Sequence, residues 1–110
     1  MGKKPPGYAA HHLIPATDPN AQDARDILNK HGIDINSELN GVYLPTLNNT
    51  TATQGIEHNG RHPKIYSEKI NDLITDANIR GGKQEVLNEL INIKNTLQNS
   101  PKNTNWSNVL

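Results

Sequence analysis

The sequence lacks several residue types that define common protein classes. None of its 110 residues is cysteine, which excludes a disulfide scaffold, a thiolate zinc site and a cysteine nucleophile. There is no phenylalanine and only one tryptophan, hydrophobic residues make up 33% of the chain, and the mean hydropathy is −0.75. A chain of this length and composition has material for one small core, so we expect a single domain.

The sequence also has no excess of charge and no long apolar run. The 11 Lys and Arg residues balance the 11 Asp and Glu residues, so a strongly basic nucleic-acid binder is not indicated. Apolar runs of only a few residues exclude a membrane span and the hydrophobic region of a secretory signal. We therefore expect no membrane partner, and export of this chain would require a larger carrier protein.

Composition divides the chain into three parts. Residues 1–7 contain two prolines, two glycines and two lysines, which is typical of a solvated linker. Residues 8–99 hold most of the apolar segments and are expected to form the folded domain. Residues 100–110 form a largely polar tail that ends with Trp106, Val109 and Leu110, and this tail either folds back onto the domain or stays loose.

Short apolar segments and the turn-forming residues that bound them predict an α+β fold. Residues 8–14 suit a strand, and residues 40–45 suit a second strand that follows an Asn-Gly turn and pairs with the first. Helices are expected over residues 20–30, from residue 63 to the glycine pair at 81–82, and over residues 83–97. The last helix carries a stripe that we expect in the core, made of Val86, Leu87, Leu90, Ile91, Ile93 and Leu97.

Four of the five histidines fall in two tight groups. His11 and His12 are adjacent in the first strand, and adjacent strand residues point to opposite faces. His58 and His62 are four residues apart, a spacing that on a helical turn lets two imidazoles meet one ion about 2 Å away. Pro63 favours a helix that begins near His62, which would leave His58 in the preceding loop. Either one or both of these two side chains could therefore be a ligand.

The order of these motifs resembles a known nuclease superfamily. Residues 11–12, 40–45 and 58–66 together resemble the HNH/endonuclease VII superfamily. The run Ala-His-His-Leu-Ile-Pro at residues 10–15 resembles, more narrowly, the AHH nuclease family, which is named for its tripeptide and found mainly at the C-termini of bacterial polymorphic toxins. The resemblance extends from about residue 8 to about residue 97.

This resemblance implies a ββα-metal site, with two strands and a helix around one divalent ion. It makes His11 a metal ligand and His12 the general base, with His58 or His62 as the ligand on the helix side. Asn40 matches the middle asparagine of the superfamily motif, which orients the base by hydrogen bonding and pins the hairpin. A plain turn residue is the alternative interpretation of Asn40.

The chemistry has a physical basis beside the resemblance. A divalent ion neutralises the charge that gathers on phosphodiester oxygens in the transition state, and a neutral imidazole with a pKa of about 6.5 activates water. Imidazole ligands favour Zn, Ni or Mn, whereas family precedent also allows Mg. Arg61 and Lys64 flank His62 and are candidates for holding the substrate phosphate, with ordinary solvated charges as the alternative.

These observations favour a metal-dependent, sequence-nonspecific endonuclease, and a DNase in particular. By resemblance, it would be the toxic C-terminal domain of a larger secreted effector, would act in the cytoplasm of the target cell, and would have a cognate immunity protein as partner. Two alternatives stay open. One is an RNase that uses the same site, and the other is a noncatalytic, zinc-stabilised protein-interaction module.

Overall fold

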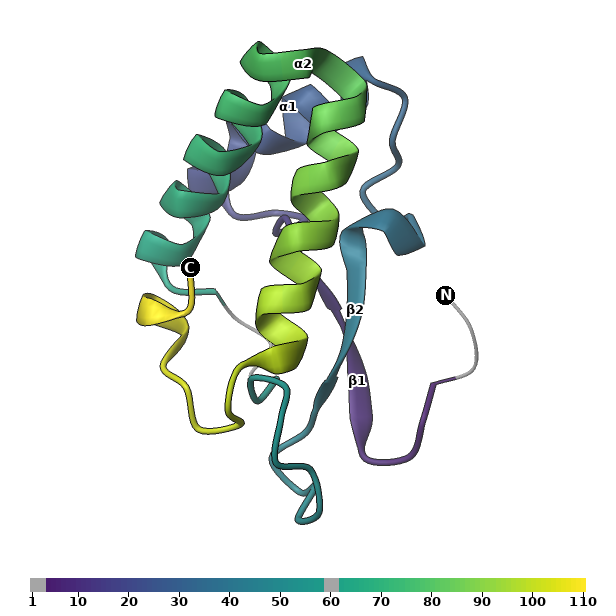
Figure 1. The fold of residues 1–110 in the computed structure, drawn as a ribbon, viewed down its shortest axis with the longest axis vertical. Coiled ribbons are helices and arrows are strands. Elements are labelled where there is room, and N and C mark those ends of the chain that lie inside the picture. The colour runs from purple at the N-terminus through teal and green to yellow at the C-terminus, as the bar shows by residue number, and fades with distance from the viewer. Residues whose placement is uncertain (1–3, 59–61) are drawn as a thin grey trace.

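The computed structural model describes residues 4–58 and 62–110 (Figure 1). Its main elements, in chain order, are β1 (Tyr8–His12), α1 (Gln22–Lys30), β2 (Gly41–Pro45) and α2 (Lys64–Asn99). Three short 3₁₀ helices accompany them, namely η1 (Pro19–Ala21), η2 (Glu38–Asn40) and η3 (Trp106–Asn108). The fold is small and α+β, as predicted. Among the described residues, no helix is both long and apolar enough to cross a membrane.

The two strands form one antiparallel sheet in which Tyr8 lies opposite Pro45 and His12 opposite Gly41. The pairing of the two strands was predicted correctly, but the prediction that an Asn-Gly turn precedes the second strand was wrong. Residues 13–40, including α1, connect the strands, and Asn40 ends η2 rather than forming a tight turn. Such a turn requires a positive φ at both central residues, whereas Gly41 is extended at φ −127. The buried Asn40 side chain is instead bonded to the backbone of neighbouring segments.

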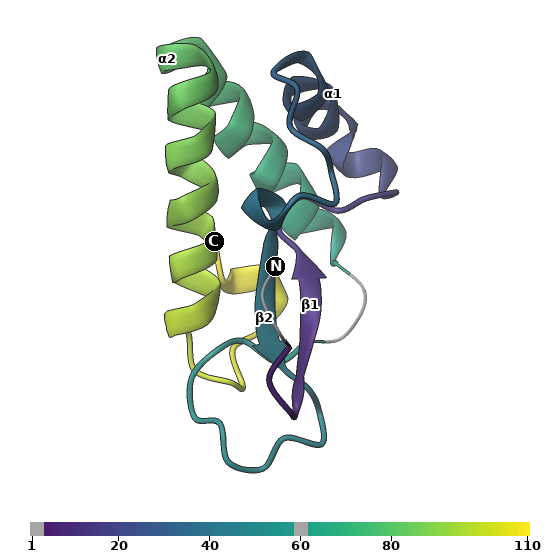
Figure 2. The same cartoon turned by 90° about the vertical axis from the view of Figure 1, so that its right-hand side faces the viewer.

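Helix α2 consists of two arms separated by a break at the predicted glycine pair. Gly82 has φ 62 and ψ −144, a conformation that is essentially restricted to glycine. Figures 1 and 2 show the arm before the break and the arm after it lying side by side in opposite directions. Helix α1 packs against the first arm, where His31 at its C-terminal end is hydrogen-bonded to Asn78 at 2.7 Å.

The core lies between the sheet and the two arms of α2. It includes Val42 and Leu44 from β2 and Ile70 and Ile74 from the first arm. The stripe predicted on the last helix is only partly buried. Its four core residues are Val86, Leu90, Ile93 and Leu97, whereas Leu87 is half-buried and Ile91 is 55% exposed. Residues 87 and 91 each follow a core residue by one position and therefore lie about 100° further round the helix.

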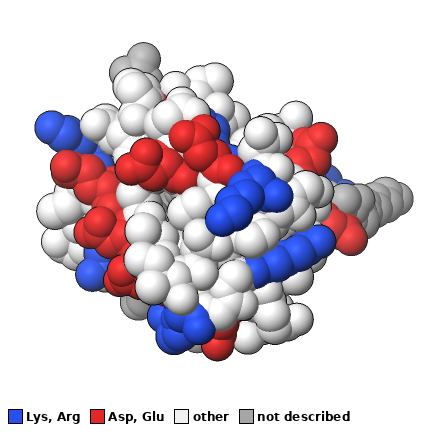
Figure 3. All heavy atoms as spheres, turned by 90° about the horizontal axis from the view of Figure 1, so that it is seen from above, with Lys and Arg blue, Asp and Glu red and all other residues white. Residues whose placement is uncertain are grey.

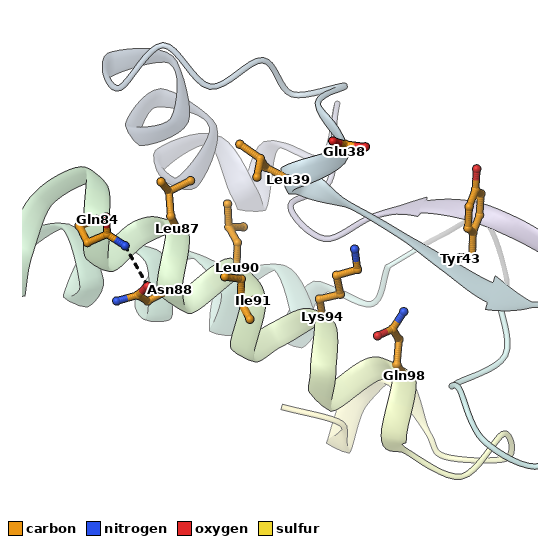
Figure 4. A pocket seen from close by; sticks show the side chains of 10 residues that line it. All are labelled: Glu38, Leu39, Tyr43, Gln84, Leu87, Asn88, Leu90, Ile91, Lys94 and Gln98. Carbon is orange, nitrogen blue, oxygen red and sulfur yellow. Dashed lines mark hydrogen bonds between the residues drawn. The ribbon is translucent and has the colours of Figure 1, made fainter. Parts of the chain in front are cut away.

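Leu87 and Ile91 line a groove of about 570 Å³ beside Leu39 and Tyr43 (Figure 4). Figure 4 shows side chains from the second arm of α2 on one side of this groove, with Leu39 and Tyr43 opposite. Its lining within the described chain contains no histidine. Leu87 and Ile91 are thus the part of the predicted stripe that lines this groove instead of the core. The histidine site lies elsewhere in the fold.

The C-terminal tail folds back onto the domain, which decides between the two alternatives left open by the sequence. Gln54 and Pro101 form an isolated antiparallel bridge, and Trp106 on η3 is 6% exposed. At the other end, the carbonyl of Gly7 accepts hydrogen bonds from the backbone N–H of Thr46 and the side chain of Asn49. The division into a linker at 1–7, a domain at 8–99 and a tail at 100–110 remains a prediction, but both flanking parts contact the domain.

Candidate active site

Three histidines from separate segments converge at the end of the sheet nearest the start of α2. His11 lies on β1 and is 4% exposed, His58 follows the loop after β2, and His62 lies two residues before α2. The two nitrogens Nδ1 of His11 and His58 are 2.8 Å apart, and the two nitrogens Nε2 of His11 and His62 are 2.6 Å apart. The structure thus brings together all three of the predicted metal ligands.

Backbone hydrogen bonds fix the two histidines that lie outside the sheet. The N–H of His58 donates to the carbonyl of Pro45 at the end of β2, at 2.8 Å. Nε2 of His62 lies 3.2 Å from the carbonyl oxygen of His12. Tyr66, one turn into α2, donates its hydroxyl to the carbonyl of Leu13 at 2.8 Å. These contacts hold the start of α2 against the end of β1, where the sequence places the histidine pair.

Burial keeps the three converging imidazoles neutral at neutral pH. Loss of hydration, together with the smaller effects of the neighbouring histidines, lowers the pKa of His11 to about 3. Burial also lowers the pKa of His58. For His62 burial lowers the pKa as well, against the opposing effects of the His12 carbonyl and the charge of Asp18. Neutral imidazole is the form that binds metal ions.

The donor chemistry of this cluster suits a divalent transition metal, but its present arrangement is that of a hydrogen-bonded chain. One ion requires the ligand nitrogens to lie about 2 Å from a common point. His11 instead turns Nδ1 to His58 and Nε2 to His62, so its ring lies between its two partners. Within residues 4–58 and 62–110, no group of three or more His, Asp or Glu side chains could hold an ion as it stands.

His12 is hydrogen-bonded to an asparagine that the sequence did not single out. Its Nε2 lies 2.9 Å from Oδ1 of Asn36, beside a small hollow of about 210 Å³. A carboxamide oxygen only accepts, so Nε2 carries the hydrogen and Nδ1 keeps a free lone pair. Asp34 anchors Asn36 by accepting its backbone N–H at 2.7 Å. This local Asp-x-Asn turn is readable in the sequence, but its proximity to His12 is not.

Asn40 pins the sheet to its surroundings. It is fully buried, its Oδ1 accepts from the N–H of Ile14 at 2.8 Å, and its Nδ2 donates to the carbonyls of Ile14 and Ile35. Its own carbonyl accepts from the N–H of Leu13. The hairpin-pinning role predicted for Asn40 therefore has direct contacts, whereas the amide bonded to the His12 imidazole belongs to Asn36.

Only one of the two predicted phosphate-holding residues lies in the described part of the chain. Lys64 is exposed at the first position of α2, two residues beyond His62. Arg61 lies outside the described residues. Viewed from the end that carries the glycine break, the surface shows acidic and basic side chains together rather than a single basic field (Figure 3). A phosphate-holding edge around Lys64 stays a prediction.

Trp106 is a second site residue that the sequence did not indicate. Its ring stacks on His11 with centroids 4.7 Å apart and planes 28° apart, and it meets His62 edge-on at 5.7 Å. Tyr66 stacks on the other imidazole, His62, at 4.9 Å. The indole N–H of Trp106 donates to the carbonyl of Glu57 at 2.8 Å. The one available signal was the lone tryptophan of the chain, which lies in a largely polar tail.

Comparison with known proteins agrees with the motif pattern. The sequence model of the AHH family, a nuclease family of the HNH/ENDO VII superfamily with a conserved AHH motif, matches residues 1–99. Nucleases of this superfamily act on nucleic acids and typically use a divalent metal ion. No curated protein and no solved structure matches the chain significantly. Because the family match covers most of the chain and includes Ala10, His11 and His12, the protein belongs to the AHH family of nucleases.

Proposed function

We propose that this protein is a metal-dependent endonuclease that hydrolyses phosphodiester bonds in DNA without sequence preference. The observation that carries the proposal is the convergence of His11, His58 and His62 beside His12. The three imidazoles provide a ligand set, and His12, whose backbone carbonyl contacts His62 and whose ring is held through one nitrogen, provides a base. In this proposal β1, β2 and the first arm of α2 form a ββα-metal site.

His12 acts as the general base. Asn36 holds the hydrogen of its Nε2, so the lone pair on Nδ1 is available to take a proton from the attacking water. A base held in one tautomer does not have to move its own proton between the two ring nitrogens before it reacts. Asn40 supports this arrangement indirectly, because it fixes the residues that follow the histidine pair.

The metal ligands are His11, His58 and His62. A bound divalent ion would stabilise the negative charge that develops on the phosphate oxygens. His11 is the common member, since it lies within hydrogen-bonding distance of both other histidines. Imidazole ligands admit Zn, Ni or Mn, and Mg would complete its coordination with water.

Weak, sequence-independent attraction of the nucleic-acid backbone fits the charge distribution. The chain has no net charge, so binding depends on a local group of cations, with Lys64 and Arg61 as candidates near His62. Such contacts to phosphate carry no base information. The same site could cleave RNA, and parallel digestion of plasmid, single-stranded DNA and tRNA distinguishes the substrates.

The resemblance to toxin-borne nucleases supports a role as the toxic domain of a larger secreted effector. In that role the domain acts in the cytoplasm of the target cell, and a cognate immunity protein protects the producer. Expression of the wild type in the bacterial cytoplasm would then arrest growth and degrade the chromosome, whereas His12→Ala would be tolerated. Equal growth of the two strains would contradict the toxin role.

The enzymatic proposal is tested by plasmid digestion with purified wild type, His12→Ala and His62→Ala. Each is assayed with EDTA and with added Mg, Mn, Zn or Ni, and circular dichroism checks folding. Asn95→Ala, at an exposed site on the second arm of α2, is the matched control. Cleavage that EDTA and His12→Ala abolish, but Asn95→Ala does not, supports the proposal. A folded wild type that cleaves no nucleic acid with any metal favours the noncatalytic zinc module.

A further inference from the structure

The C-terminal tail contacts all three segments that carry the histidine cluster, and it lies beyond the part of the chain that the family model matches. The match ends at residue 99, whereas the indole that stacks on His11 belongs to residue 106. This contact therefore involves a residue outside the matched part of the chain. The tail could have either of two roles: it could complete the core, or it could set the geometry of the site.

The contacts of Trp106 are directed at the site. One face of its ring covers His11, and its edge meets His62. Its N–H holds the carbonyl of Glu57, the residue immediately before His58. One side chain thus connects all three segments that carry the converging histidines.

The rest of the tail reinforces the same loop. The N–H of Glu57 donates to the carbonyl of Lys102 at 3.1 Å, and the N–H of Gly55 donates to the carbonyl of Ser100 at 2.8 Å. The segment that leads to His58 is therefore held by the tail on one side and by Pro45 of β2 on the other. Two further bonds hold it independently of the tail: the N–H of His58 donates to Pro45 of β2, and the N–H of Ile56 donates to the carbonyl of Leu97 on α2.

We propose that Trp106 is a positioning residue of the active site, which fixes the ring of His11 by stacking and fixes the loop before His58 through its indole N–H. A stacked ring restricts rotation of the imidazole, and the bond to Glu57 restricts the backbone that carries the next ligand. This inference rests on the proposed nuclease function, because it assigns the histidines to a metal site.

The activity test compares Trp106→Leu and Trp106→Phe with wild type. Leu keeps an apolar side chain but removes the flat ring, and Phe keeps a ring but removes the N–H. Leu90→Ala is the matched control, since Leu90 is 1% exposed in the core and its replacement lowers stability without touching a histidine. All variants are assayed at a temperature at which circular dichroism shows them folded.

We expect Trp106→Leu to lower kcat about tenfold or more with little change in KM. The kcat of Trp106→Phe should lie between that of Trp106→Leu and that of wild type. Leu90→Ala should retain the wild-type kcat. If Trp106→Leu loses stability as Leu90→Ala does but keeps the wild-type kcat, the residue is an ordinary core residue and the proposal fails.

A spectroscopic test is independent of catalysis. Trp106 is the only tryptophan, so all indole fluorescence reports on the face of His11. Titration with Co²⁺ or Ni²⁺, which quench nearby indoles, is expected to give saturable quenching in wild type and at least tenfold weaker binding in His11→Ala. Identical quenching in the two proteins would overturn the proposal. Saturable, His11-dependent quenching in a protein that cleaves no nucleic acid would instead contradict only the nuclease function.

Discussion

Nε2 of His12 donates its hydrogen to Oδ1 of Asn36 at 2.9 Å, across a sequence separation of 24 residues. This contact selects one tautomer of the proposed base, and it involves a different asparagine from the one that the superfamily motif singles out. The two asparagines have separable tasks, since Asn36 contacts the imidazole and Asn40 contacts the backbone.

Asn36→Ala tests the orientation of the base. Because His12 then loses the acceptor for its Nε2 hydrogen, kcat is expected to fall about 10- to 100-fold with little change in KM or stability. Asn36→Asp retains an acceptor oxygen and should recover part of the activity. Steady-state kinetics with a fluorogenic oligonucleotide measures both. An unchanged kcat in Asn36→Ala would show that the contact does not serve catalysis.

Asn40→Ala tests the structural role of the buried amide. The substitution leaves buried backbone groups of Ile14 and Ile35 without their partner, and each unsatisfied group costs about 1–3 kcal/mol. We expect the free energy of unfolding in urea to fall by about 3 kcal/mol or more. A variant of unchanged stability that lacks activity would place Asn40 in the chemistry instead.

Tyr66→Phe removes the hydroxyl that ties α2 to the end of β1. Burial raises the pKa of this phenol, so it remains a protonated donor to the Leu13 carbonyl over the working pH range. The loss should lower stability by about 1–3 kcal/mol, while the ring that stacks on His62 is retained. Thermal unfolding measures the first effect. A large fall in kcat in the folded variant would indicate that the hydroxyl takes part in the reaction.

Ser67→Ala should change how stability depends on acid. The Ser67 hydroxyl donates to Asp18 at 2.7 Å and lowers the pKa of that carboxyl below its ordinary value of 3.8. A lowered pKa in the folded state contributes stability above about pH 4, and this contribution is lost as the pH falls through the folded pKa. The difference in unfolding free energy between wild type and Ser67→Ala is therefore expected to be larger at pH 7 than at pH 2.5. A difference independent of pH would contradict this linkage.

Gly82→Ala tests the break in α2. The backbone at φ 62 and ψ −144 costs about 1–3 kcal/mol for a residue with a side chain, although an added Cβ would meet no atom of a residue packed against this position within 4 Å. Chemical denaturation should reveal a loss of that size. Lys83→Ala, at the next and exposed position, is the control for a substitution without backbone strain. Equal stability of the two variants would mean that the break can relax.

The parts of the fold that could be predicted from the sequence are those that follow from local periodicity and from residues that begin or end helices and strands. The two short strands, the helix over residues 22–30 and the glycine break in α2 each depend on signals within a few residues. The grouping of the histidines was also readable, because the motif order carries it. The prediction of an Asn-Gly turn was wrong because the side chain of Asn40 bonds to Ile14, 26 positions away, as well as to the nearby Ile35, and local turn statistics do not include such tertiary contacts.

The site residues that sequence reasoning missed all act through tertiary contacts. Asn36 lies in a segment without periodicity, and only the path of the chain from α1 to β2 brings it to His12. Trp106 lies 95 positions from the ring on which it stacks. The exposure of Ile91 likewise depends on where the neighbouring arm and strand lie, since the helix pattern alone treats every apolar position as equivalent.

The long connection between β1 and β2 has a consequence for how the protein folds. Strands joined by a two-residue turn can pair within microseconds, whereas these two are separated by residues 13–40 and must first close a loop that contains α1. We therefore expect these strands to pair more slowly than the strands of a tight hairpin. Because His11 and His12 lie on β1, we expect a chain whose helices have formed but whose strands have not yet paired to be inactive.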